Sequence, residues 1–147
     1  MFLNPYHTQT GSTIRITSQQ ASDFAKRVAG DFNPIHDAGA RRFCVPGDLL
    51  FALVLNRFGL SPRMDFRFRN MVGDGKPLCL VEGEAGQVEV KDDEGRLYLE
   101  VERQGQASHE PALIEAFTRR YVAFSGKNFP HVLKPLLEEQ GVMFNPK

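Results

Sequence analysis

The sequence predicts an α+β fold in which an antiparallel sheet packs around one buried helix. Residues Leu49 to Leu55 are apolar almost without interruption, and a helix that is apolar on every side must be buried. From Met64 onward, apolar residues recur at every second position, as in strands with one face turned to water. The chain has 147 residues, which is enough for one domain with a hydrophobic core.

The first expected elements are a weak strand and an amphipathic helix. Residues Thr13 to Thr17 alternate polar and β-branched side chains, which favours a strand. Ser18 follows as the expected N-cap. Apolar residues then recur at helical spacing, at Ala21, Phe24, Ala25 and Val28. Gly30 can adopt a positive φ and end this helix.

The buried helix has signals at both of its ends. Pro46, Gly47 and Asp48 open it. Gly59 is a good C-cap, and Pro62 prevents the helix from resuming. Asp48 is typical of an acidic side chain in the first turn, where it stabilises the helix dipole.

The strands follow this helix. Phe66 and Phe68 alternate with charged residues, so both should face the core. Gly73 to Gly75 then marks a turn.

A hairpin is expected next. Val88 and Val90 alternate with polar residues before the acidic turn Asp92 to Gly95, and apolar residues alternate again from Leu97 to Val101. In this second strand Leu97, Leu99 and Val101 alternate with Arg96, Tyr98 and Glu100. With Thr13 to Thr17, about four strands can be named.

The end of the chain is predicted to be helical. Apolar residues return to helical spacing at Leu113, Phe117, Tyr121 and Phe124, and a second helical segment is expected around Val132 to Leu137. These patterns divide the chain into a sheet-and-helix domain over 1–110 and a helical extension packed on it over 111–147. We also expect that the chain is shortened at its C-terminal end.

The most informative segment is Gly30-Asp31-Phe32-Asn33-Pro34-Ile35-His36. Asn33 is a good N-cap and Pro34 a good first helical residue, so a helix should begin there. Asp31 and His36 flank this helix start, which lets a carboxylate and an imidazole converge on one cavity. The spacing therefore predicts an acid/base pair.

This segment resembles the motif of MaoC-like (R)-specific enoyl-CoA hydratases, Gly-Asp-x-Asn-Pro-Leu/Ile/Val-His. The resemblance implies a hotdog fold, in which a curved antiparallel sheet wraps a central helix. It also implies that Asp31 and His36 activate the water that adds to an enoyl thioester, without metal or redox cofactor. Two positions depart from the family pattern: Ala29 stands where Gly or a small polar residue is usual, and Arg42 where a small residue is usual.

The resemblance also implies substrate contacts around the pair. It makes the Gly47 N–H the oxyanion donor, and Asp48 beside it departs from the family because a carboxylate competes for the same donors. Asn33 is expected to hold the turn as an N-cap. Basic side chains could meet the phosphates of coenzyme A, although each is equally typical of solvated surface. These candidates are Arg41, Arg42, Arg67, Arg69 and Lys76.

Over nearly its whole length, from Met1-Phe2-Leu3 to Val142-Met143-Phe144-Asn145-Pro146, the chain is more closely similar to a bacterial family that carries the same MaoC-like segment. That similarity names no reaction.

Composition narrows the classes of partner and site. Lys+Arg and Asp+Glu both total 18, and no basic stretch is interleaved with aromatic residues, so we expect no nucleic-acid partner. The start lacks a signal peptide and the longest apolar run is too short to span a bilayer, which predicts a cytoplasmic protein without a membrane partner. Cys44 and Cys79 are isolated, and His7, His109 and His131 are scattered, so neither a disulfide nor a metal site is expected.

Three functions remain open. The first is (R)-specific hydration or dehydration of an enoyl thioester, carried by coenzyme A or an acyl carrier, by a homodimer that uses Asp31 and His36. The second is a hotdog protein that binds an acyl thioester without turnover, which the departures at Ala29, Arg42 and Asp48 favour. The third is a hotdog thioesterase, which would need a carboxylate on the central helix.

Overall fold

The computed structural model describes residues 2–41, 43–128 and 143–145. The strands are β1 (Thr8–Thr10), β2 (Thr13–Arg15), β3 (Arg63–Phe68), β4 (Leu78–Glu82), β5 (Val88–Asp92), β6 (Leu97–Gln104) and β7 (Met143–Asn145). They form one sheet in the order β1-β2-β4-β5-β6-β3-β7. The first six strands in this order pair antiparallel, whereas β7 runs parallel to β3.

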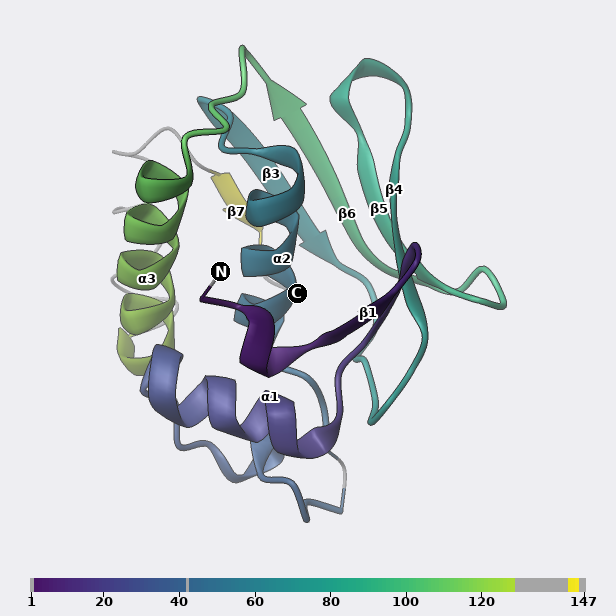
Figure 1. Ribbon diagram of the computed structural model, residues 1–147, viewed down its shortest axis with the longest axis vertical. Helices are drawn as coiled ribbons and strands as arrows, with labels where there is room; N and C mark the ends of the chain where they lie inside the picture. The colour runs from purple at the N-terminus through teal and green to yellow at the C-terminus, as the bar shows by residue number, and fades with distance from the viewer. Residues whose placement is uncertain (1, 42, 129–142, 146–147) are drawn as a thin grey trace.

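The helices lie together on one side of this sheet (Figure 1). The helical segments are η1 (Asn4–Tyr6), α1 (Ser18–Phe24), η2 (Ala25–Ala29), η3 (Pro34–His36), α2 (Gly47–Phe58), η4 (Glu84–Gly86) and α3 (Pro111–Asn128). Helix α2 lies between the sheet and α3, and α1 crosses near the beginning of α2 (Figure 1). The fold is therefore α+β, as the sequence predicts.

Helix α2 forms the centre of the core. All residues from Leu49 to Leu55 are buried. The Phe51 ring packs against Phe66 of β3, with centroids 4.8 Å apart, and stacks on Tyr121 of α3 at 3.9 Å. Because α2 contacts the sheet on one side and α3 on the other, its apolar residues are covered all round.

The helix predicted from the apolar spacing between Leu113 and Phe124 is confirmed. Helix α3 begins at Pro111 and places Tyr121 and Val122 in the same core as α2. The second helical segment expected around 132–137 lies outside the described residues. Among the described residues, no helix is both long enough and apolar enough to cross a membrane.

The first helix starts one residue before the position predicted from sequence. Thr17, and not Ser18, is the N-cap: its hydroxyl accepts from the Gln20 N–H, and the Gln20 side chain accepts from the Thr17 N–H. Thr and Gln three residues apart form a capping box, which a Ser18 cap would lack. Gly30 ends the segment with a φ of 64°, as expected.

The sheet has three more described strands than the sequence suggested. Strand β1 is entirely exposed, so no apolar alternation marks it. The sequence of strand β4 is a short apolar run, and such a run is compatible with either a strand or a helix. Strand β7 is held in place by pairing with β3, a contact between segments distant in sequence.

Tyr98 is buried, although it alternates along β6 with the buried Leu99 and Val101. Its hydroxyl donates to Asp92 Oδ2 at 2.9 Å, and the Asp92 carboxyl also accepts the Arg96 N–H. A register irregularity at Val90 and Lys91 interrupts simple alternation along this hairpin.

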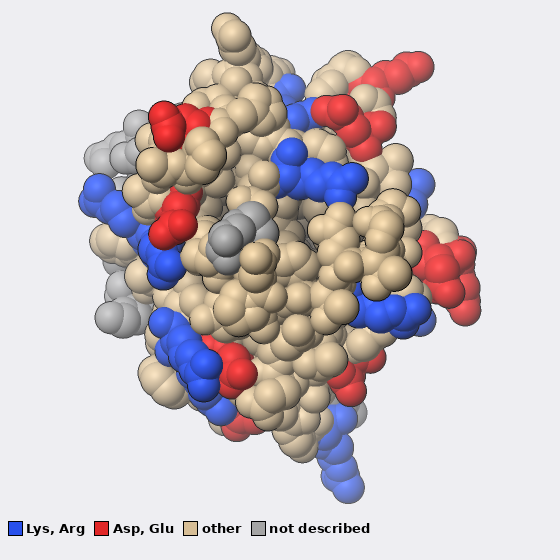
Figure 2. Space-filling model, viewed as in Figure 1, with Lys and Arg blue, Asp and Glu red and all other residues tan. Residues whose placement is uncertain are grey.

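Charged side chains are dispersed on the surface seen in Figure 2. Lys and Arg side chains alternate with Asp and Glu around its rim, and the middle is largely uncharged (Figure 2). This face presents no continuous basic surface of the kind that a nucleic acid needs.

Arg103 of β6 fastens the end of α2 to the sheet. Its guanidinium donates to Gly86 O at 2.8 Å, Phe58 O at 3.3 Å and Glu82 Oε2 at 2.6 Å. The Arg103 side chain is only 10% exposed. It thereby satisfies a carbonyl at the end of α2 that no helical N–H can reach.

We expect Arg103→Met to lower the free energy of unfolding by about 2 kcal/mol, because several charge-assisted hydrogen bonds are lost together. Denaturant titration followed by circular dichroism measures the change. Arg63→Met, at an exposed position on β3, is the matched control. Equal stabilities of the two variants would contradict this role.

Candidate active site

Local hydrogen bonds set the shape of the Gly30–His36 loop. The Asp31 N–H donates to Ala25 O at 2.7 Å, and Asp31 Oδ1 accepts the Asn33 N–H at 2.9 Å. Asn33 caps η3, as the sequence predicts, with Oδ1 accepting the Ile35 N–H at 3.1 Å. The expected helix is only the three-residue turn Pro34–His36. This turn carries the chain from Asp31 back toward His36.

The structure brings the Asp31 and His36 side chains together. His36 Nε2 lies 3.5 Å from Asp31 Oδ2, and the two side chains are 14% and 23% exposed. A water molecule placed beside these atoms can approach both of them, since they are only 3.5 Å apart. The pair is therefore sheltered but reachable from solvent.

The Cys44 backbone orients the imidazole of His36. His36 Nδ1 lies 2.9 Å from Cys44 O. A carbonyl oxygen only accepts, so Nδ1 carries a proton and donates it. In the neutral imidazole, Nε2 then holds the lone pair and faces Asp31. Cys44 precedes Pro46 by two residues, so this bond also places His36 beside the start of α2.

The Cys44 thiol does not act as a nucleophile in this arrangement. Its Sγ lies 3.8 Å from His36 Nδ1, the nitrogen that donates to the carbonyl. Burial, with a contribution from the Asp31 charge, raises the pKa of the Cys44 thiol. The thiol consequently stays protonated at neutral pH.

Gly47 and Asp48 form the beginning of α2. A Cβ added to Gly47 would lie 3.1 Å from the Phe68 ring, so this position has little room for a side chain. Asp48 turns toward α3, where Oδ1 accepts the Ser125 hydroxyl at 2.8 Å. Burial raises the pKa of Asp48 to about 7, the Ser125 bond opposes this shift, and the Asp31 charge adds to it.

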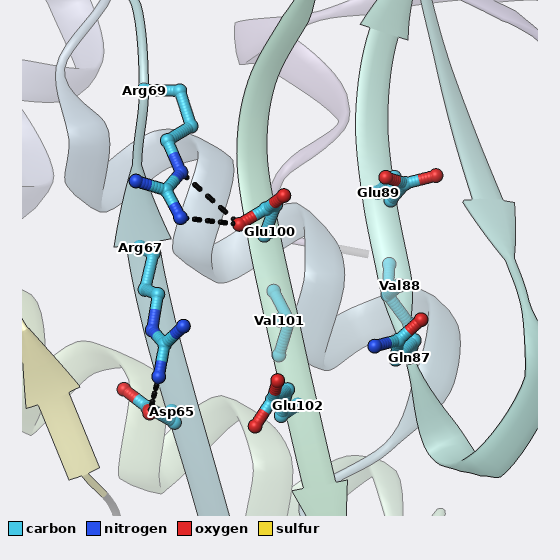
Figure 3. Close-up of a pocket in the computed structure, with 9 residues that line it drawn as sticks. All are labelled: Asp65, Arg67, Arg69, Gln87, Val88, Glu89, Glu100, Val101 and Glu102. Carbon is cyan, nitrogen blue, oxygen red and sulfur yellow. Dashed lines mark hydrogen bonds and ion pairs between the residues drawn. The ribbon is translucent and has the colours of Figure 1, made fainter.

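Two of the basic candidates, Arg67 and Arg69, lie away from the Asp31–His36 pair. Arg67 and Arg69 lie on the face of the sheet opposite α2, because they alternate along β3 with the inward-facing Phe66 and Phe68. Arg67 pairs with Asp65 at 3.3 Å, and Arg69 makes two bonds to Glu100, the shorter 2.8 Å (Figure 3). They line an outer groove of about 310 Å³ with carboxylates of β5 and β6.

The remaining basic candidates are placed differently. Arg41 lines an open hollow beside η3, next to Pro34, Ile35 and Asp37. Lys76 lies 3.7 Å from Asp92. Arg42 lies outside the described residues. No group of three or more metal-ligating side chains gathers within the described residues.

The chain matches one protein-family model over residues 1–147, described as a protein of unknown function (DUF3581). The chain belongs to the DUF3581 family. No curated protein and no solved structure matches it.

Three groups around the DUF3581 site were not assigned to it from the sequence. The Cys44 carbonyl is a backbone group, which residue types do not reveal. Ser125 and Tyr121 are four residues apart on α3 and therefore share a face, which is the one sequence signal for their common position. Ser125 is 77 residues from Asp48, so only the packing of α3 on α2 brings them together.

The DUF3581 site can move protons. It offers a carboxylate and an imidazole of fixed tautomer, close to a second carboxyl at the start of a buried helix. Such a set can accept a proton from water at one atom and deliver it at another.

Proposed function

We propose that this protein is a hotdog domain that catalyses (R)-specific hydration and dehydration of an enoyl thioester. The substrate would be an acyl-CoA or an acyl-carrier thioester. The observation that carries the proposal is the approach of Asp31 Oδ2 and His36 Nε2 to 3.5 Å within a MaoC-like Gly-Asp-x-Asn-Pro-x-His segment.

The arrangement of elements supports the hotdog part of this proposal. Six antiparallel strands lie on one side of α2, which is apolar and buried from Leu49 to Leu55. The acid/base pair lies near the beginning of that helix, because Cys44 ties His36 to the segment that enters it.

In the proposed hydration, a water molecule lies beside Asp31 and His36 and hydrogen-bonds to both side chains. The pair takes a proton from this water as its oxygen bonds to Cβ of the enoyl group, and a proton is returned to Cα. Negative charge builds on the thioester oxygen during this step. The Gly47 N–H at the start of α2 would stabilise it, where the helix dipole also favours an anion.

Incubation with crotonyl-CoA tests the proposal. We expect the absorbance of the enoyl thioester to fall as 3-hydroxybutyryl-CoA forms, and chiral chromatography should identify the R product. Two results would refute the proposed hydratase activity. One is protein-dependent turnover that does not form this product, and the other is no turnover at micromolar enzyme.

Thioester hydrolysis is a second candidate, favoured by one observation. Asp48 places a carboxyl on the buried helix, as a hotdog thioesterase requires. A thiol reagent distinguishes the two reactions, because hydrolysis releases free coenzyme A and hydration does not. Binding of butyryl-CoA without either reaction would instead indicate a thioester-binding protein.

We also propose a homodimer, since an isolated curved sheet leaves an edge to be covered. Light scattering at micromolar concentration should give twice the 16.5 kDa mass of the chain. A monomeric mass would contradict the dimer.

A further inference from the structure

Strand β4 has a neighbour along its whole length on one side only. On that side it pairs with β5 from Leu78 to Glu82. On the other side, among the residues that the structure describes, β2 pairs with it only at Leu78, opposite Ile14. Beyond Leu78, β4 therefore forms an edge of the sheet, on the right in Figure 1.

The backbone groups of Leu80 and Glu82 face this edge. The Gly83 N–H donates to Gln87 O at 2.8 Å, so the backbone of Gly83 faces β5. The direction of the N–H and C=O groups alternates along an antiparallel strand. Val81 therefore also faces β5, whereas Leu80 and Glu82 face the other way. Their N–H and C=O groups are the ones that a further strand would meet.

The side chains beside this edge are open to solvent. Val81, which follows the buried Leu80, is 45% exposed. The Glu82 side chain is 57% exposed. Since successive side chains of a strand leave opposite faces, the edge between these two can be approached from both faces of the sheet. An open strand edge of this kind is a template for pairing with another chain.

The composition of β4 suits an apolar partner strand. Its sequence is Leu-Cys-Leu-Val-Glu, and Arg103 compensates the charge of Glu82, with Nη2 lying 2.6 Å from Oε2. Strand β1, at the end of the sheet, consists of exposed Thr and Gln side chains, so pairing there would bury no apolar group. Of these two edges, β4 gains more apolar burial on association.

Two copies of β4 fit each other best in one register. When they pair antiparallel about a two-fold axis at Val81, Leu80 of each copy lies opposite Glu82 of the other. The edge-facing N–H and C=O groups of both residues then exchange hydrogen bonds, and Val81 packs against its own counterpart. A register centred on Glu82 would place two carboxylates opposite each other. One centred on Leu80 would need Leu78, which β2 already holds.

We propose that the open edge of β4 is the surface on which two copies of this protein associate, with Val81 on the two-fold axis. This inference rests on the homodimer included in the proposed function and names its surface. The partner it fits is a second copy of the chain, because one register satisfies the edge groups of both copies together.

A disulfide tests the register. Residues opposite each other in a non-hydrogen-bonded antiparallel pair have Cα atoms about 4.5 Å apart, a spacing that a disulfide can span. In a Cys79→Ser background, Val81→Cys should form a covalent dimer under mild oxidation, seen by non-reducing electrophoresis. Leu113→Cys in the same background, at a position on α3 that is 48% exposed, is the matched control and should not cross-link. Equal cross-linking of the two variants would overturn the proposal.

A like charge on the axis tests the same surface without a cross-link. Val81→Lys should fold normally, because this side chain is exposed, but the dimer would hold two ammonium groups opposite each other. Light scattering over a concentration series should show association weakened about fivefold or more. Leu113→Lys should associate as the wild type does. A dimer that Val81→Lys leaves unchanged would overturn the β4 surface while the homodimer itself stands.

Failure of this inference can be told apart from failure of the proposed function. A monomeric wild type at micromolar concentration would overturn both the homodimer and the β4 surface. Hydration of crotonyl-CoA is measured independently of mass, so its absence would refute the hydratase and leave the cross-linking result to decide the surface.

Discussion

Asp31→Asn and His36→Ala should each lower kcat/KM for crotonyl-CoA by at least about 100-fold, the effect typical of losing a general acid or base. The two side chains face one another across 3.5 Å, and in the proposed reaction both would serve one water molecule. Because they act as a unit, the double variant should be little slower than either single variant.

Matched variants separate chemistry from folding. Asp37→Asn removes an exposed carboxylate six residues from Asp31, and His109→Ala removes an exposed imidazole. Both should retain wild-type kcat/KM. Near wild-type rates in Asp31→Asn and His36→Ala, with turnover measurable in the wild type, would show that the pair is not catalytic.

Phe51→Ala should lower the free energy of unfolding by about 3–5 kcal/mol, the usual range for removing a buried aromatic ring. Phe51 is fully buried on α2 and contacts Phe66 of the sheet and Tyr121 of α3. Its removal therefore leaves a cavity at the junction of all three layers, which rigid neighbours cannot fill.

Urea titration measures this loss. Phe51→Leu refills part of the space and should cost less than Phe51→Ala, whereas Phe32→Ala removes a ring that is 70% exposed and should change stability little. A loss below 1 kcal/mol in Phe51→Ala would indicate that the core repacks around the cavity.

The predictable parts of the fold are those that repeat along the chain. The apolar run from Leu49 to Leu55 and the alternation around Phe66 both report burial directly, and both are confirmed. Strand β1 carries no such pattern, since it is exposed along its length. Its pairing with β2 depends on backbone hydrogen bonds, which any residue except proline can donate.

The candidate site also has a part that the local sequence predicts and a part that depends on tertiary packing. Asp31 and His36 are close because a short turn of Asn and Pro joins them, and local chemistry of this kind is visible in sequence. Arg67 and Arg69 were expected near a substrate, yet the alternation that turns Phe66 and Phe68 inward requires the arginines to point outward. The sequence could not identify Ser125 as part of the site, because its contact with Asp48 depends on the packing of α3 on α2.

Strand β7 limits how two copies of this protein could join. Residues Met143–Asn145 pair with Asp65, Phe66 and Arg67, so the backbone groups on that side of β3 are already engaged. Two sheets therefore cannot merge across this strand while the C-terminal segment holds its place. A dimer must therefore use another surface, or Met143–Asn145 must first leave β3. In the second case a partner chain and Met143–Asn145 of the same chain compete for β3, so the dimer would form only at sufficient protein concentration.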